Sequence, residues 1–134
     1  MRLELAGKTD LALRALVALK ASGERTAGPD LAEALDTTHL YLPQVMRPLV
    51  QQSWVTSTPG PGGGYELVVG LGSVSVLELI EAMEGRTDSD TCVLKGGTCD
   101  TSDPCALHDA WTSARDALLH ELSTTSLADA TRKG

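Results

Sequence analysis

The sequence lacks phenylalanine and has few aromatic residues of any kind. Its 134 residues include two tryptophans and two tyrosines, so the core of the fold must be aliphatic. This scarcity also argues against a platform for single-stranded nucleic acid, because such platforms stack bases on aromatic side chains. No apolar run reaches the roughly 18 residues of a membrane-spanning helix. Met1 to Leu5 lack the charged-then-apolar layout of a signal peptide, which predicts a cytoplasmic protein.

Basic residues are also scarce, and the formal net charge is −7. Neutralisation of phosphates normally supplies much of the affinity of a DNA-binding protein. Residues 1–56 carry six basic and six acidic side chains, whereas residues 57–84 carry four glutamates and no base. Residues 85–134 carry five basic and eight acidic side chains. DNA binding is therefore compatible with the N-terminal part of the chain and disfavoured elsewhere.

The sequence contains no pattern typical of an enzyme. No paired carboxylates and no nucleophile–base pair stand out. The glycine run from Gly60 to Gly64 lacks the Gly-Lys-Ser/Thr that ends a nucleotide-binding loop. We therefore do not expect catalysis.

Two helices separated by a short polar turn follow the first helix. Thr9 is expected to cap that first helix, beginning at Asp10. Pro29 suits the first turn of a short helix over residues 30–35. The next helix is opened by His39 and has apolar residues at i, i+3, i+4 and i+7. These are Leu42, Val45, Met46 and Leu49. The arrangement predicts a helix-turn-helix.

A β-hairpin is expected directly after the helix-turn-helix. The β-prone runs 54–58 and 65–69 flank a turn rich in glycine and proline. A hairpin at this position forms the wing of a winged helix. Ser75 and Glu78 then make a capping box for a fourth helix. The predicted fold class is mainly α with a small β-hairpin wing.

Residues 86–103 show no periodicity, which predicts a loop, and a loop of this length is usually either functional or disordered. Cys92, Cys99 and Cys105 lie within fourteen residues of one another. Their odd number disfavours a disulfide framework and favours metal or redox chemistry. Cys105 is expected as the second residue of the last helix, on the same face as His108. Thiolates suit iron–sulfur clusters and zinc alike, so the residues alone leave both metals open.

The last helix is predicted to start at Asp103 and Pro104. Its narrow apolar stripe is typical of a helix that packs on a partner helix, so we expect a homodimer. The stripe consists of Leu107, Trp111, Ala114, Leu118 and Leu122. Residues 124–134 are polar and expected to fray. The predicted organisation has three parts. Residues 1–84 form a winged helix-turn-helix DNA-binding domain, residues 85–105 form a cysteine loop, and residues 106–134 form a dimerisation helix with its tail.

Several motifs resemble the Rrf2-type winged-helix transcription regulators. They are Thr9 to Leu16, the Tyr41-Leu42-x-Gln44 of the third helix, Gly62-Gly63-Gly64-Tyr65-x-Leu67, Glu84-Gly85 and the three cysteines. Their order and spacing cover roughly residues 3 to 130. The resemblance implies a homodimer with two winged helices. The two-fold symmetry of such a dimer predicts a palindromic operator, and we expect the protein to act there as a repressor. The resemblance also implies an iron–sulfur cluster on Cys92, Cys99 and Cys105.

The resemblance offers two candidates for a fourth cluster ligand. In NsrR-like members an aspartate at the start of the first helix completes a [4Fe–4S] cluster from the other subunit, and its match here is Asp10. In IscR-like members a histidine three residues after the last cysteine completes a [2Fe–2S] cluster, and its match is His108. The first-helix motif favours Asp10 and [4Fe–4S]. The expected signals are nitric oxide, redox state or iron–sulfur status.

The third helix is expected to lie in the major groove of DNA, where Gln pairs with adenine and Arg with guanine. The wing is expected along the phosphates. The candidate contacts are Thr38, His39, Tyr41, Gln44, Arg47, Thr58, Gly62 and Gly63. Pro59 stands where the family's wing generally carries an arginine, which removes a phosphate contact. Pro48 is expected to kink the helix.

Two other functions fit the same residues. In the first, the regulator holds no cluster and responds to thiol oxidation or to a small ligand. In the second, zinc stabilises an interaction module whose winged helix binds protein. The acidic charge and Pro59 slightly favour the zinc-stabilised module. Operator binding with a steep salt dependence would exclude that module.

Overall fold

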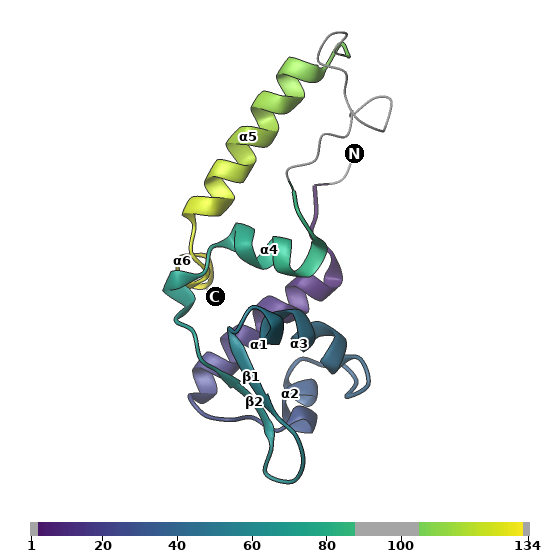
Figure 1. The fold of residues 1–134 in the computed structure, drawn as a ribbon, viewed down its shortest axis with the longest axis vertical. Coiled ribbons are helices and arrows are strands. Elements are labelled where there is room, and N and C mark those ends of the chain that lie inside the picture. Colours follow the sequence, from purple (N-terminus) through teal and green to yellow (C-terminus); the bar gives the residue numbers. More distant parts are fainter. Residues whose placement is uncertain (1–2, 88–104, 133–134) are drawn as a thin grey trace.

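The computed structural model describes residues 3–87 and 105–132. They form a winged-helix body from which one long helix projects (Figure 1). The element bounds are α1 Gly7–Ser22, α2 Gly28–Ala34, α3 Leu42–Gln51, β1 Val55–Thr58, β2 Gly64–Leu67, the 3-10 helix η1 Leu71–Ser73, α4 Val76–Glu84, α5 His108–Thr124 and α6 Leu127–Thr131. The predicted fold class, mainly helical with a small hairpin, is confirmed.

An aliphatic core lies between α1, α2, α3 and α4. The four predicted apolar positions of α3 are all buried, as are Leu16 and Leu19 of α1. Burying one leucine or valine side chain contributes about 1.5–3 kcal/mol, so this face is sufficient to hold α3 on the body. The opposite face of α3 is left toward solvent.

The first helix begins earlier than the sequence predicts. It starts at Gly7, and Ala6 rather than Thr9 occupies the capping position. Thr9 is buried inside the first turn, and its hydroxyl donates to Oε2 of Glu84 at the end of α4. The Ala6 amide donates to the same oxygen at 3.2 Å. The expectation of a Thr9 cap was wrong because a partner distant in sequence takes up its hydroxyl.

The third helix also differs at its start. It begins at Leu42, and His39 belongs to the preceding turn. Pro43 lies in the first turn, where its missing amide has no helical partner to lose. Pro48 lies inside the helix, which nevertheless continues to Gln51. The proline therefore removes one backbone donor without ending the helix.

The wing is a two-stranded antiparallel hairpin. Its register pairs Val55 with Leu67 and Thr58 with Gly64. A third segment joins its edge, because Thr26 and Tyr65 exchange two backbone hydrogen bonds of 2.8 and 2.9 Å. The connection between α1 and α2 is thus fixed to the wing.

The predicted capping box of α4 is confirmed. The Glu78 amide donates to the Ser75 hydroxyl at 3.0 Å, and the Ser75 amide donates to the Glu78 carboxylate at 3.2 Å. The last long helix, however, starts at His108. Cys105 precedes it in a turn instead of being its second residue. Asp103 and Pro104, the predicted start, lie outside the described residues.

The C-terminal segment was wrongly expected to fray. Residues 127–131 form α6, and Leu127 is fully buried in the core. The Leu127 amide donates to the Val74 carbonyl at 2.8 Å, and the Val76 amide donates to the Thr125 carbonyl at 2.8 Å. These bonds tie the segment after α5 to the start of α4.

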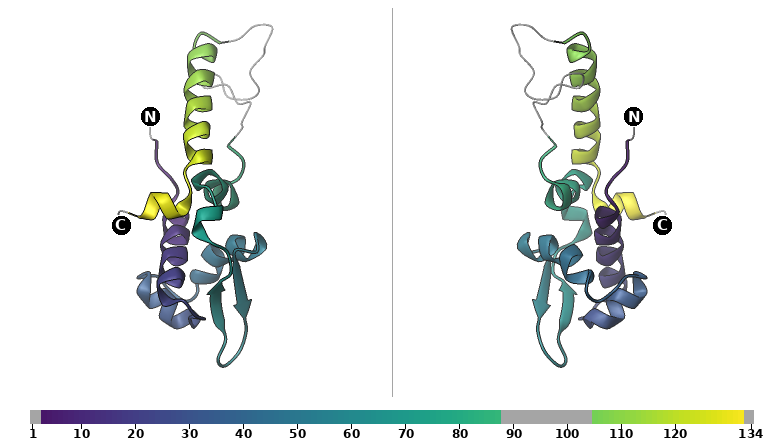
Figure 2. Two further views of the ribbon diagram at one scale, coloured as in Figure 1. Left: turned by 90° about the vertical axis from the view of Figure 1, so that its left-hand side faces the viewer. Right: turned by 90° about the vertical axis from the view of Figure 1, so that its right-hand side faces the viewer.

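Helix α5 and the wing lie at opposite ends of the molecule (Figures 1 and 2). None of the 17 residues of α5 is buried, and Leu118 is 48% exposed. Helix α5 therefore presents most of its surface to solvent in the single chain. Among the described residues, no helix combines the length and apolarity needed to cross a membrane.

Candidate DNA interface and cluster ligands

The solvent face of α3 carries the two long polar side chains predicted to read bases. Gln44 and Arg47 are both exposed and lie three residues apart on one helix face. Gln51 continues the same face by another turn and is also exposed. Because Val45, Met46 and Leu49 hold the other face in the core, the polar side chains have a fixed direction.

The turn before α3 places further groups beside this face. The Thr38 carbonyl and hydroxyl both accept from the Tyr41 amide, at 3.2 and 3.1 Å, so Thr38 orders the turn. His39 is exposed and Tyr41 is half-buried. Leu40 is 78% exposed, which is unusual for a leucine in an ordered turn. Sequence reasoning missed Leu40, whose only signal is its place inside a polar turn.

A small cleft of about 340 Å³ separates α3 from the wing. Arg47 and Gln51 line one side, and Ser57 and Tyr65 line the other. Burial raises the pKa of the Tyr65 phenol above its usual 10.0, so the hydroxyl remains a hydrogen-bond donor at neutral pH. The sequence analysis included Tyr65 only as part of a motif, whereas the structure places it with Arg47 in the lining of one cleft.

The predicted wing contacts differ in what they can offer to a phosphate. Thr58 is exposed at the end of β1. The Gly63 amide already donates to the Gly60 carbonyl at 3.0 Å, so it is occupied within the turn. In the part of the chain that the structure describes, the Gly62 amide makes no backbone hydrogen bond. Thr58 and Gly62 are therefore better suited than Gly63 to meet DNA.

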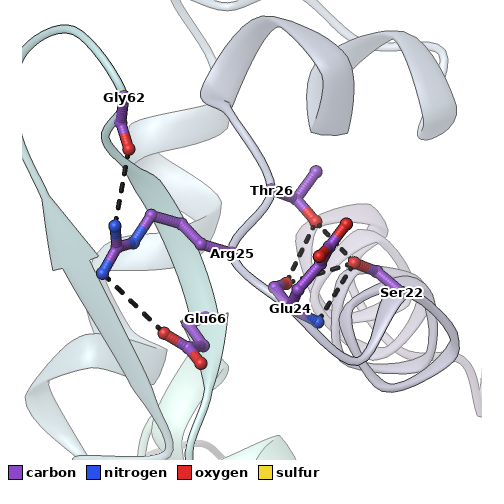
Figure 3. Close-up of polar contacts among 6 residues, drawn as sticks. All are labelled: Ser22, Glu24, Arg25, Thr26, Gly62 and Glu66. Atoms are coloured by element: carbon purple, nitrogen blue, oxygen red, sulfur yellow. Dashed lines mark hydrogen bonds and ion pairs between the residues drawn. The ribbon is translucent and has the colours of Figure 1, made fainter.

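Arg25 reaches the wing from the connection between α1 and α2 (Figure 3). Its guanidinium donates to the Gly62 carbonyl at 3.5 Å and lies 4.0 Å from the Glu66 carboxylate. Both charged side chains are nearly half exposed, at 45% and 43%. No sequence signal links Arg25 to Gly62, because 37 residues separate them.

The candidate ligand Asp10 lies in the first turn of α1 and is 67% exposed. Its carboxylate is 3.8 Å from the guanidinium of Arg14, one turn further along the helix. Arg14 also donates to the Leu35 carbonyl at 3.3 Å, at the end of α2. One arginine thus connects the Asp10 carboxylate to the helix-turn-helix.

Of the other predicted ligands, Cys105 and His108 are described, and both are partly exposed. The His108 amide donates to the Cys105 carbonyl at 3.1 Å, in the turn that leads into α5. Cys92 and Cys99 lie outside the described residues. Within residues 3–87 and 105–132, no three His, Cys, Asp or Glu side chains gather into a metal site.

A wing, a helix-turn-helix and an exposed polar face on the second helix together define a winged-helix protein of the DNA-binding type. Residues 5–133 match the model of the Rrf2 family, described as an iron-dependent transcriptional regulator. The chain therefore belongs to the Rrf2 family of transcription regulators and is not an enzyme.

Regulators that are similar in sequence or in fold support this assignment. The transcriptional regulator IscR of Citrobacter koseri is 33% identical over 129 residues, which are 96% of this chain and 78% of that protein. The structure of CymR, the global cysteine regulator of B. subtilis, matches with a TM-score of 0.76 at 22% identity, over 99% of both chains. The T. potens IscR structure matches with a TM-score of 0.72 at 20% identity, over 98% of this chain and 88% of that one.

Proposed function

We propose that the protein is a repressor that binds a palindromic operator as a homodimer under the control of an iron–sulfur cluster. Cys92, Cys99 and Cys105 would hold the cluster, and Asp10 of the other subunit would complete a [4Fe–4S] site. The single observation that best supports this is the exposed Asp10 carboxylate, which is connected through Arg14 to the helix-turn-helix.

The donor set suits such a group. Thiolates are the usual ligands of iron–sulfur clusters. The described cysteine, Cys105, is partly exposed and lies in the turn that leads into α5. Asp10 is exposed on α1, and Figure 1 shows the start of α5 at the far end of the molecule from the winged helix. A carboxylate supplied by a second subunit agrees with this separation. When bound, the cluster would supply a reactive centre for nitric oxide or oxidants.

The residues around Asp10 suggest how the signal reaches DNA. As a cluster ligand, the Asp10 carboxylate would no longer pair with Arg14, which would then donate to the Leu35 carbonyl alone. On release of Asp10, its ion pair with Arg14 on α1 would form again. Because Leu31 and Leu35 share the core with the buried face of α3, the two states of Arg14 would favour different positions of α3. A ligand shifts such an equilibrium only by its differential affinity for the two states.

The test is an anaerobic absorption spectrum together with iron and sulfide assays of purified protein. The proposal expects about four irons per subunit. The Asp10→Ala variant should keep its fold and lose iron faster under nitric oxide, with a changed operator response. Glu33→Ala is the control, because Glu33 is also an exposed helical carboxylate and does not line the cleft between Arg25 and the wing turn. About two irons per subunit, with Asp10→Ala unaffected, would move the fourth ligand to His108 and the cluster to [2Fe–2S].

A second candidate function is supported by the similarity to the CymR fold. Here the protein holds no cluster, and oxidation of its thiols or a small ligand controls operator binding. Colourless protein after anaerobic reconstitution, with operator affinity that changes on thiol oxidation, would support this second function and contradict the first.

A further inference from the structure

The wing carries no positive charge of its own. Between Arg47 and Glu78 the sequence holds one charged residue, Glu66, which lies on β2. A wing that follows a DNA backbone needs cations, because phosphate neutralisation supplies much of the affinity. The cation near this wing must therefore come from another part of the chain.

We propose that Arg25 supplies the phosphate contact of the wing and binds the DNA backbone next to Gly62. This rests on the proposed binding of an operator. Arg25 lines a cleft of about 540 Å³ whose other wall is the wing turn, with Thr58, Gly60 and Gly62 along it. The guanidinium offers five N–H donors, of which the Gly62 carbonyl and Glu66 engage only some.

The segment that carries Arg25 is held rigidly, which favours such a role. Gly23, at φ 69°, ends α1 and directs the chain toward the wing. The Ser22 and Thr26 side chains and the Glu24 backbone form a small hydrogen-bonded network on the side away from the wing (Figure 3). The Thr26–Tyr65 bridge fixes the same segment to β2. Arg25 is thus placed before DNA arrives.

The present partners of Arg25 are weak enough to give way. The distance of 4.0 Å to Glu66 is at the limit of an ion pair, and both side chains are nearly half exposed. Exposed ion pairs of this kind contribute little to stability. A phosphate forms shorter, charge-assisted hydrogen bonds with a guanidinium. Glu66 therefore acts as a competitor that holds Arg25 in the cleft until a phosphate replaces it.

The test measures how salt affects DNA affinity. The probe is a fluorescent duplex that the wild-type protein enriches from random-sequence DNA, and an unrelated duplex of equal length serves for comparison. The variants are Arg25→Gln, Arg25→Lys and, as a control with the same loss of charge, Lys20→Gln. Lys20 lies on α1 beside α6 and away from the wing cleft.

Arg25→Gln should weaken binding to both duplexes about tenfold for each bound subunit, the loss expected for one charge-assisted contact. The slope of log affinity against log salt should fall by about 0.9 for each bound subunit. Arg25→Lys should keep most of the slope, and Lys20→Gln should leave it unchanged. The unfolding midpoint of Arg25→Gln should stay near that of the wild type.

Glu66 provides a second, independent measurement. Glu66→Gln should bind DNA more tightly than the wild type. This gain in affinity should exceed that of Glu24→Gln, which removes the same charge from the other side of the segment. In the Arg25→Gln background this gain should shrink.

If the wild type binds DNA normally and Arg25→Gln has an unchanged salt slope, the role assigned to Arg25 is wrong, whereas the proposed operator binding still stands. Equal defects in Arg25→Gln and Arg25→Lys would also overturn this role, by showing that Arg25 only braces the wing. If the wild type binds no duplex in a salt-dependent way, operator binding itself fails.

Discussion

At the residue scale, the glycines of the wing turn differ in what each position requires. Gly62 and Gly64 both have positive φ, at 76° and 144°. A Cβ at Gly62 would meet no atom within 4 Å, whereas one at Gly64 would lie 2.2 Å from the Thr26 carbonyl oxygen. Gly64 is therefore needed because the α1–α2 connection passes directly against it.

This difference predicts unequal effects of the same substitution. Gly62→Ala should lower the free energy of unfolding by about 1–2 kcal/mol, the usual cost of left-handed backbone for a side chain. Gly64→Ala should cost about 1–3 kcal/mol more, because backbone must move to relieve the collision. Urea unfolding of both variants measures this. Equal losses would show that the Thr26 segment can move away from the wing at no cost.

The sequence identifies residues whose partners are near in the chain and misses those whose partners are distant. Ser75 and Glu78 form the predicted capping box because the two residues are three apart, within one helical turn. Thr9 looks equally like a cap, yet its hydroxyl donates to Glu84, and Arg25 gives no sign of its place beside Gly62. The side chains on α3 could be predicted because helical periodicity alone separates Gln44 and Arg47 from the buried positions.

At the element scale, the same distinction applies to whole helices. Helices α1 to α4 and the hairpin could be predicted, because each has an apolar period or a turn signal of its own. Helix α6 could not, because its five residues contain one leucine and no period. Its stability comes from the backbone bonds to the start of α4 and from the burial of that leucine.

Helix α6 therefore contributes to stability, which a substitution can measure. Leu127→Ala should lower the free energy of unfolding by about 2–4 kcal/mol, as for other fully buried leucines. Leu40→Ala, at a residue that is 78% exposed, should change it by less than about 0.5 kcal/mol. Denaturant unfolding of the two variants compares them directly. A Leu127→Ala variant as stable as Leu40→Ala would mean that the tail does not pack on the core in solution.

At the scale of the whole molecule, the proposed function assigns separate tasks to the two ends. The wing and α3 lie at one end, and α5 extends from the other (Figure 2). The proposed cluster site draws its ligands from two different elements, because Cys105 precedes α5 whereas Asp10 lies in the first turn of α1. Two chains that cross through their α5 helices would bring the cysteine loop of one chain toward the first helix of the other. Dimerisation, sensing and DNA binding then become properties of the assembly and not of the single chain.

A substitution on the exposed face of α5 tests the proposed dimer. Leu118 lies in the middle of the predicted stripe and is 48% exposed. Leu118→Glu would place a charge in the proposed helix–helix interface, where no partner would offset its loss of water. We expect the 14.1 kDa chain to sediment as a monomer in analytical ultracentrifugation, where the wild type sediments at twice that mass. His120→Glu is the control, because a residue two positions along lies about 200° around the helix.

The loss of dimerisation should also lower the operator affinity of Leu118→Glu, because one half-site cannot retain the protein. Its iron content should fall too, because the proposed ligand Asp10 comes from the partner. A monomeric variant that keeps its iron would support α5 as the dimer contact but exclude Asp10 of the partner as a ligand.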